Sequence, residues 1–129
     1  MHWTRRYVLR TVDDMTTTET SANHAFFMLV RTTQAWLALT PPDRFAFVRA
    51  VVQPVLVRHP EVSLRYFDSE AFNATYSDVI MWETADLFAY QAVVEELRET
   101  PFWGVYFEVV EIVASIEQAY ARHYGDDPL

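Results

Sequence analysis

Three residue types are missing or scarce in this chain of 129 residues, which has no cysteine, no lysine and only two glycines. The absence of cysteine excludes disulfides, thiolate nucleophiles and cysteine-ligated metal sites. The absence of lysine excludes Schiff-base chemistry on a lysine amine. Phosphate-binding loops and dinucleotide fingerprints need a cluster of glycines, which Gly104 and Gly125 do not form. The sequence therefore predicts no nucleotide cofactor.

Histidine placement and charge narrow the range of partners. The four histidines stand at positions 2, 24, 59 and 123, and no two have the i, i+4 spacing that places two metal ligands on the same face of a helix. We therefore expect no metal site. The formal net charge of −8 should repel nucleic acid and anionic membranes, so neither is an expected partner.

The amino-terminal part of the sequence reads as an extension. Its apolar run at residues 7–9 is too short for a secretory or membrane-spanning segment, so a cytoplasmic location is expected. A polar stretch rich in threonine follows and would bury little surface. We predict a flexible extension over residues 1–22 and a single domain over residues 23–129. The alternative is an arm that docks through Trp3, Tyr7 and Leu9.

Hydrophobic periodicity predicts alternating strands and helices from residue 24 onward. The segment Thr40-Pro41-Pro42-Asp43 has the cap, the early prolines and the early acid of a helix start, and Pro54 should kink that helix. Gly125 is placed to end the last helix. The predicted elements are strand 24–31, helix 40–59, strand 62–67, strand 74–83, helix 86–98, strand 106–113 and helix 115–124.

This order of elements indicates an α+β fold. It is the split βαβ, ferredoxin-like arrangement, in which helices cover one face of an antiparallel sheet, here with an additional C-terminal helix. The opposite face would carry large apolar side chains, which a soluble protein must cover. Two-fold association of the sheets is the commonest solution, so we expect a homodimer.

Asp78 is the most informative residue, because an ionisable carboxylate stands inside a segment that otherwise reads as a buried strand. If Leu64 packs beneath the helices with Val62, Tyr66, Val79 and Met81, the alternation puts the other side chains on the open face. That set is Arg65, Phe67, Tyr76, Asp78, Ile80 and Trp82. Arg65 would then pair with Asp78, either as a structural ion pair or within a binding site.

Further candidates follow from residue chemistry. His24 is the one histidine inside a predicted strand and is a candidate proton shuttle. Glu108 and Glu111 have opposite parity, so we expect one to point inward, to a predicted ligand pocket, and the other outward, without a preference for either. The predicted catalytic residues are Asp78, His24, Arg65 and Tyr76. The predicted substrate-binding residues are the aromatic side chains of Trp82, Phe67, Tyr90, Phe102, Trp103 and Tyr106.

Several segments resemble a known family. They are residues 66–72, 77–79, 82–84, 97–102 and 106–112. Over about residues 24 to 124 the chain is similar to the darcynin family of small bacterial proteins. This resemblance implies the architecture of dimeric α+β barrels, a group that includes cofactor-free monooxygenases, aromatic polyketide cyclases and dismutating enzymes. The sequence lacks a histidine well placed for haem ligation, which argues against the haem-binding branch of that group.

These observations leave two functions open. The first is a small cofactor-independent enzyme of bacterial secondary metabolism, a monooxygenase or cyclase acting on a hydrophobic, aromatic or polyketide-like molecule. Arg65 would anchor an anion, Asp78 would orient the substrate or act as a base, and Tyr76 would donate a hydrogen bond. The second is a non-catalytic module that binds a small molecule or only dimerises.

Overall fold

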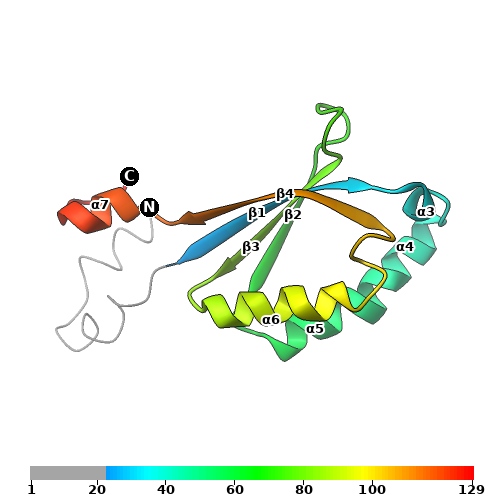
Figure 1. The fold of residues 1–129 in the computed structure, drawn as a ribbon, viewed down its shortest axis with the longest axis horizontal. Coiled ribbons are helices and arrows are strands. Elements are labelled where there is room, and N and C mark those ends of the chain that lie inside the picture. The colour runs from blue at the N-terminus through cyan, green and yellow to red at the C-terminus, as the bar shows by residue number, and fades with distance from the viewer. Residues whose placement is uncertain (1–22) are drawn as a thin grey trace.

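The computed structural model describes residues 23–129 as a four-stranded sheet with helices (Figure 1). The strands follow the order β2-β3-β1-β4 across the sheet, and every neighbouring pair is antiparallel. The predicted α+β, ferredoxin-like order is confirmed, whereas the predicted extension over residues 1–22 lies outside the described residues. The elements are β1 (His24–Thr32), α3 (Gln34–Leu37), α4 (Pro41–Phe47), the π-helix η1 (Val48–Val52), α5 (Gln53–Arg58), β2 (Ser63–Asp68), β3 (Asp78–Thr84), α6 (Leu87–Arg98), β4 (Phe107–Ile116) and α7 (Ala119–Tyr124).

Helices α4, α5 and α6 lie on one face of the sheet (Figure 1). On that face Met28 of β1 and Trp82 of β3 are completely buried, together with Val93 and Leu97 of α6. Burying large apolar side chains contributes roughly 1.5–3 kcal/mol each, so this layer supplies most of the driving force for folding. The Arg58 guanidinium lies 2.6 Å from a Glu96 oxygen and joins the ends of α5 and α6.

The predicted helix over residues 40–59 is confirmed, although it is not regular throughout. The Thr40 hydroxyl caps it by accepting a hydrogen bond of 3.3 Å from the Asp43 amide. The irregularity lies in η1, immediately before Pro54, which lacks the N–H that would bond to the Ala50 carbonyl. The longest described helix, α6, has 12 residues, and within residues 23–129 none is long and apolar enough to cross a membrane.

Two strand boundaries differ from the sequence prediction. Strand β3 begins at Asp78 and not at residue 74, because the Asn73 carboxamide oxygen accepts hydrogen bonds from the Thr75 and Tyr76 amides and holds them in a turn. Strand β4 runs to Ile116, beyond the predicted end at residue 113, because it stays paired with β1 as far as His24. Helix α7 therefore starts later than predicted, and Gly125 ends it in the left-handed conformation.

The register between β2 and β3 overturns the predicted pairing of Arg65 with Asp78. Arg65 lies opposite Met81, whereas Asp78 lies opposite Asp68, and these two pairs occupy different faces. Asp78 therefore faces the helices, and Arg65 faces the open side. The predicted face of β3 was wrong because apolar residues occupy both parities of this strand, so alternation alone could not decide between them.

Other residues of β3 also lie on the face opposite to the one predicted. Ile80 and Trp82 are buried beneath the helices and do not lie on the open face. Val79 and Met81, which were expected beneath the helices, have the parity of Arg65 and lie on the open face. For β2, the prediction that Leu64 and other residues of its parity face the helices agrees with the register.

A bulge in β4 changes the faces of the two glutamates. Leu29 pairs with Glu111, but the next residue of β1 pairs with Val109, so Val110 is an extra residue in β4. This insertion brings Glu108 and Glu111 to the same open face, contrary to the expectation from parity. Arg31 donates a hydrogen bond of 3.3 Å to Glu108, and the Tyr76 hydroxyl donates one of 3.1 Å to Glu111.

Asp86 caps the longest described helix and provides a test of the fold. Its carboxylate accepts hydrogen bonds from the Phe88 and Ala89 amides at 3.0 and 3.2 Å. We expect Asp86→Ala to lower the free energy of unfolding by about 1 kcal/mol, the usual value of an N-cap. Urea denaturation followed by circular dichroism would measure this. Glu95→Ala removes the same charge from an exposed position of the same helix and should change the stability by less than half as much.

Candidate functional site

A cavity of about 660 Å³ lies between the helix-covered face of β2 and β3 and the helical segments α3, α4 and η1. Most of its lining is apolar, and it reaches across to the start of β4. Apolar side chains that line it include Trp36, Leu37, Phe45, Val48, Leu64 and Phe107. Its size and composition are those of pockets for small organic ligands, which commonly have volumes of about 300–1,000 Å³.

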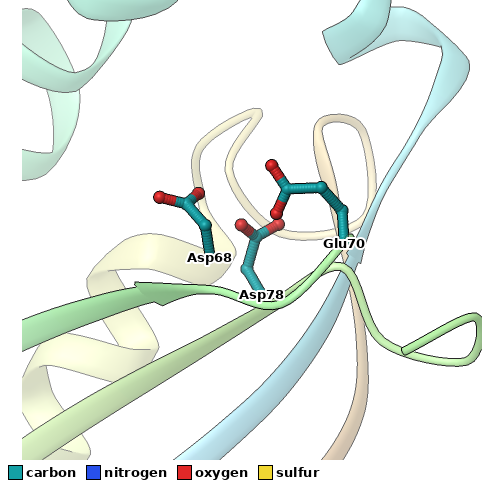
Figure 2. Close-up of side chains that lie close together, drawn as sticks. All are labelled: Asp68, Glu70 and Asp78. Carbon is teal, nitrogen blue, oxygen red and sulfur yellow. The ribbon is translucent and has the colours of Figure 1, made fainter. Parts of the chain in front are cut away.

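Three carboxylates gather at one part of this cavity. Asp68 ends β2, Glu70 stands in the turn that follows, and Asp78 begins β3. Each offers a carboxylate oxygen that lies within 4.8 Å of those of the others, and all three residues line the cavity. Figure 2 shows the three side chains projecting from the same side of the ribbon, with Asp78 between the other two. Asp78 is only 4% exposed, whereas Asp68 and Glu70 are open to solvent.

Burial raises the pKa of Asp78 from 3.8 to about 6. The Ser77 hydroxyl opposes this by donating a hydrogen bond of 2.7 Å to the carboxylate, which lowers the pKa. A hydrogen bond with the Asp68 carboxyl group raises it, because one proton is then shared between two acids. Asp78 therefore changes its charge near neutral pH, in contact with the cavity.

Tyr66 supplies a further partner for Asp78 from the middle of β2. Burial, together with the nearby charge of Asp78, raises the pKa of the Tyr66 phenol. The phenol therefore keeps its proton and serves as a hydrogen-bond donor. Its hydrogen bond to Asp78 stabilises the ionised carboxylate and lowers the pKa of that group.

Arg44 is the basic residue that lines the cavity. Its Nε and Nη2 atoms donate hydrogen bonds to the carbonyl oxygens of Trp36 and Leu37, at 3.1 and 3.0 Å. These bonds tie α4 to the preceding helix α3. Arg44 therefore has a structural role, because it holds together the two helices that border the cavity.

The structure separates the predicted catalytic residues. Asp78 lines the cavity. Arg65 and Tyr76 lie on the other side of the sheet, where Arg65 stacks over the Phe67 ring at 5.3 Å and Tyr76 contacts Glu111. His24 lies at the start of β1, opposite Thr84, and is distant in register from Asp78, which pairs with Val30. The expected constellation of these four side chains is therefore not formed.

The predicted aromatic residues are divided in the same way. Phe102 is buried and lines the cavity. Trp82 belongs to the core, and Tyr90 stacks on the buried ring of Phe26 with centroids 3.6 Å apart. Tyr106 packs edge-on against the cavity residue Trp36 at 5.4 Å, and Trp103 lies under the guanidinium of Arg98 at 5.7 Å. Their roles in substrate binding stay predictions.

Sequence reasoning missed Tyr66, Asp68 and Glu70 as site residues. A signal for Asp68 was present, because it follows Leu64 and Tyr66 at the spacing of two that keeps side chains on one face of a strand. The antiparallel pairing of β2 with β3, joined by residues 69–77, also brings the acids at the two ends of this connection together. The helical residues of the lining could not be found in this way, since their contact with β2 depends on tertiary packing.

The three carboxylates offer oxygen ligands of the type that hard divalent cations prefer. A haem fits less well. Among the described residues no histidine lines the cavity, so there is no imidazole to serve as an axial ligand. The acidic cluster would also oppose the anionic propionates of a haem.

The raised pKa of Asp78 predicts how its replacement affects stability. The folded chain binds a proton at Asp78 more tightly than the unfolded chain, so the free energy of unfolding falls as the pH rises from about 4 to about 6. We expect Asp78→Asn to remove this decrease and to stabilise the protein above about pH 7 by on the order of 1–2 kcal/mol. Denaturant titrations across this pH range would measure it. Glu95→Gln should leave the pH dependence unchanged, and a destabilised Asp78→Asn protein would contradict the assignment.

Solved structures with a similar fold include chlorite dismutases. A mutant enzyme from Candidatus Nitrospira defluvii matches with a TM-score of 0.63 and 12% identity over 88% of this chain and 44% of its own. A dimeric chlorite dismutase from Nitrobacter winogradskyi matches with a TM-score of 0.60 and 17% identity over 73% of this chain and 57% of its own. The chain thus spans about half the length of these proteins, and the likeness establishes the fold alone.

Comparison of sequences identifies the family. The darcynin profile, described as a domain of unknown function, matches residues 9–129. A darcynin homolog from Streptomyces avermitilis is 45% identical over 116 residues, which are 89% of this chain and 96% of the relative. Darcynin 1 from Acinetobacter baumannii is 35% identical over 88 residues, which are 67% of this chain and 98% of the relative. The chain belongs to the darcynin family.

Proposed function

We propose that this protein is a small cofactor-independent enzyme that acts on a hydrophobic, aromatic molecule held in the cavity, with Asp78 as its proton-transfer group. The observation that supports this is the position of a carboxyl group with a pKa of about 6 against an apolar cavity of about 660 Å³. At neutral pH such a group is mostly ionised and can still be reprotonated. It can therefore take a proton from a bound substrate and return it later.

Cyclisation is the reaction that this chemistry serves with no further reactant. The Asp78 carboxylate removes a proton from an acidic C–H group, and the resulting carbanion forms a bond to a carbonyl carbon of the same molecule. Asp78 then returns the proton to the alkoxide that forms. Polyketide-like molecules suit this scheme, because a C–H group between two carbonyls is acidic. Oxygenation would begin with the same proton transfer and would need O₂ as the oxidant.

The second candidate is a non-catalytic module that binds a small molecule in the same cavity. The observation that favours it is the pairing of Asp78 with Ser77 and Tyr66 inside the protein. These hydrogen bonds stabilise the carboxylate and make it a weaker base. The two candidates differ in whether bound molecules lose protons faster than they do in buffer.

Proton exchange on a model ketone separates the two candidates. 2-Tetralone has an aromatic ring and an acidic C–H group, and NMR in D₂O follows its hydrogen–deuterium exchange. We expect the protein to accelerate this exchange, with a rate that rises as Asp78 ionises near pH 6. Asp78→Asn should lose about 100-fold or more of the acceleration, as expected for a general base. Glu95→Gln, a matched loss of charge outside the cavity, should retain it.

Binding of 2-tetralone without faster exchange would favour the binding module. If 2-tetralone binds but its exchange is no faster than in buffer, the enzymatic proposal fails. Binding can be assigned to the cavity with Val48→Trp, which fills the space, because Val48 lines it. Val57→Trp adds the same ring to α5 at a side chain that is 78% exposed and does not line the cavity, so it should leave binding unchanged.

We also infer that the open face of the sheet pairs with a second copy of the chain. Phe67 and Val113 lie on that face and are 43% and 42% exposed, and Phe27 and Met81 beside them are only half-buried. Apolar side chains on a continuous sheet face favour a covering partner. The described helices all lie elsewhere, so a second sheet of the same kind is the simplest cover.

Light scattering coupled to size exclusion tests this association. The native protein should have twice the 15.1 kDa mass of the chain. Val113→Asp places a charge on the proposed interface and should yield monomers at micromolar concentration. Phe88→Asp removes a more exposed apolar residue from α6, away from this face, and should leave the dimer intact. A monomeric native protein would rule the association out.

A further inference from the structure

We propose that the cavity selects an apolar organic cation, a protonated amine whose ammonium group lies among Asp68, Glu70 and Asp78 while its aromatic body fills the remaining space. This inference rests on the proposed function, because it names the class of molecule that the same cavity takes. It goes further by assigning a charge to the ligand. It also gives a role to Asp68 and Glu70, which the proton-transfer scheme leaves unused.

The charged groups of the cavity lining favour a cationic ligand. Among the described residues, three carboxylates and one guanidinium line the cavity, so the balance of charge is negative over the pH range in which Asp78 is ionised. The single guanidinium offsets only one of the three carboxylates, and its Nε and Nη2 atoms donate to the carbonyl oxygens of Trp36 and Leu37, not to the acidic cluster. An anionic ligand would therefore meet repulsion, whereas a cation would be attracted in a partly desolvated site.

The geometry of the carboxylates suits an ammonium group. Their oxygens lie within 4.8 Å of one another, and an N⁺–H···O⁻ hydrogen bond has a length of about 2.7–2.9 Å. A nitrogen placed between three such oxygens can donate one hydrogen bond to each. Figure 2 shows that the three carboxylates come from one side of the ribbon, so a single ligand group can approach all of them.

The rest of the cavity suits an aromatic body more than a bare metal ion. Trp36, Phe45, Phe102 and Phe107 contribute rings to the lining. Rings provide apolar contact for a flat molecule and favourable faces for a cation. A divalent cation takes about 6–8 oxygen ligands or bound waters, and it would use none of this apolar surface.

Ionisation of the lining sets the expected pH dependence. Other titratable side chains described around Asp78 come from two elements and one turn. They are Tyr66 and Asp68 on β2, Glu70 in the turn after β2, and Arg44 on α4. The Tyr66 phenol, whose pKa is raised, keeps its proton, and Asp78, whose pKa is raised to about 6, ionises between about pH 5 and pH 7. Affinity for an amine should therefore increase over this interval.

A set of ligands with one ring system and three charges tests the inference. The probes are 2-aminotetralin, its alcohol analogue 2-tetralol, and tetralin-2-carboxylate, measured by isothermal titration calorimetry on the full chain at physiological ionic strength. We expect the amine to bind at least about 10-fold more tightly than the alcohol, as a charge-assisted hydrogen bond allows, and the carboxylate to bind most weakly.

Matched variants place the effect at the acidic cluster. Glu70→Gln changes an exposed side chain and should preserve the fold, which circular dichroism checks. It should weaken amine binding by several-fold and leave the binding of 2-tetralol unchanged, and Asp78→Asn should weaken the amine further. Glu108→Gln removes the same charge from the open face, so it should alter neither ligand.

The outcomes separate this inference from the proposed function. Equal affinity for the amine and the alcohol overturns the organic-cation inference and leaves a cavity for apolar molecules. Binding of Mg²⁺ or Mn²⁺ at the acidic cluster without binding of the amine also overturns it. If none of the three ring compounds binds, both the inference and the proposed function are wrong.

Discussion

The placement of Asp68 directly opposite Asp78 is the constraint on which the site depends. Two like charges facing each other across an antiparallel pair destabilise that pair. The strands nevertheless meet in this register because it directs Ile80 and Trp82 of β3 into the core, with Leu64 of β2 packed against them. The turn closes the arrangement through a hydrogen bond of 2.8 Å from the Ser69 amide to the Ser77 carbonyl. Core packing thus holds the two acids together.

This arrangement links stability to chemistry. A buried carboxyl group with a raised pKa costs folding free energy at neutral pH, and the surrounding core must offset that cost. Ser77 limits the penalty: its hydroxyl donates to Asp78 and accepts a hydrogen bond of 2.8 Å from the Thr32 amide of β1. The acid is therefore held by three strands, since Tyr66 approaches it from β2.

The sequence predicted the elements and their order better than it predicted which way the side chains face. Caps such as Thr40 and Asp86 mark helix starts chemically, so the helices that begin at these two residues could be found from local signals. The two faces of β3 are both apolar, and alternation could not tell Asp78 from its neighbours. The exchange of faces at Val110 needed the pairing with β1, which is a property of the folded sheet. The cavity combines β2 with α3 and α4, so its lining depended on tertiary packing as well.

The π-helix η1 lies between the part of one continuous helical segment that lines the cavity and the part that packs in the core. A π-helical turn holds an additional residue compared with an α-helical turn, so it shifts the rotational phase of everything that follows. Before it, α4 presents Phe45 to the cavity, and after it, α5 buries Val55 in the core. The cavity lining on α4 and the packing of α5 against α6 therefore use different parts of one continuous segment.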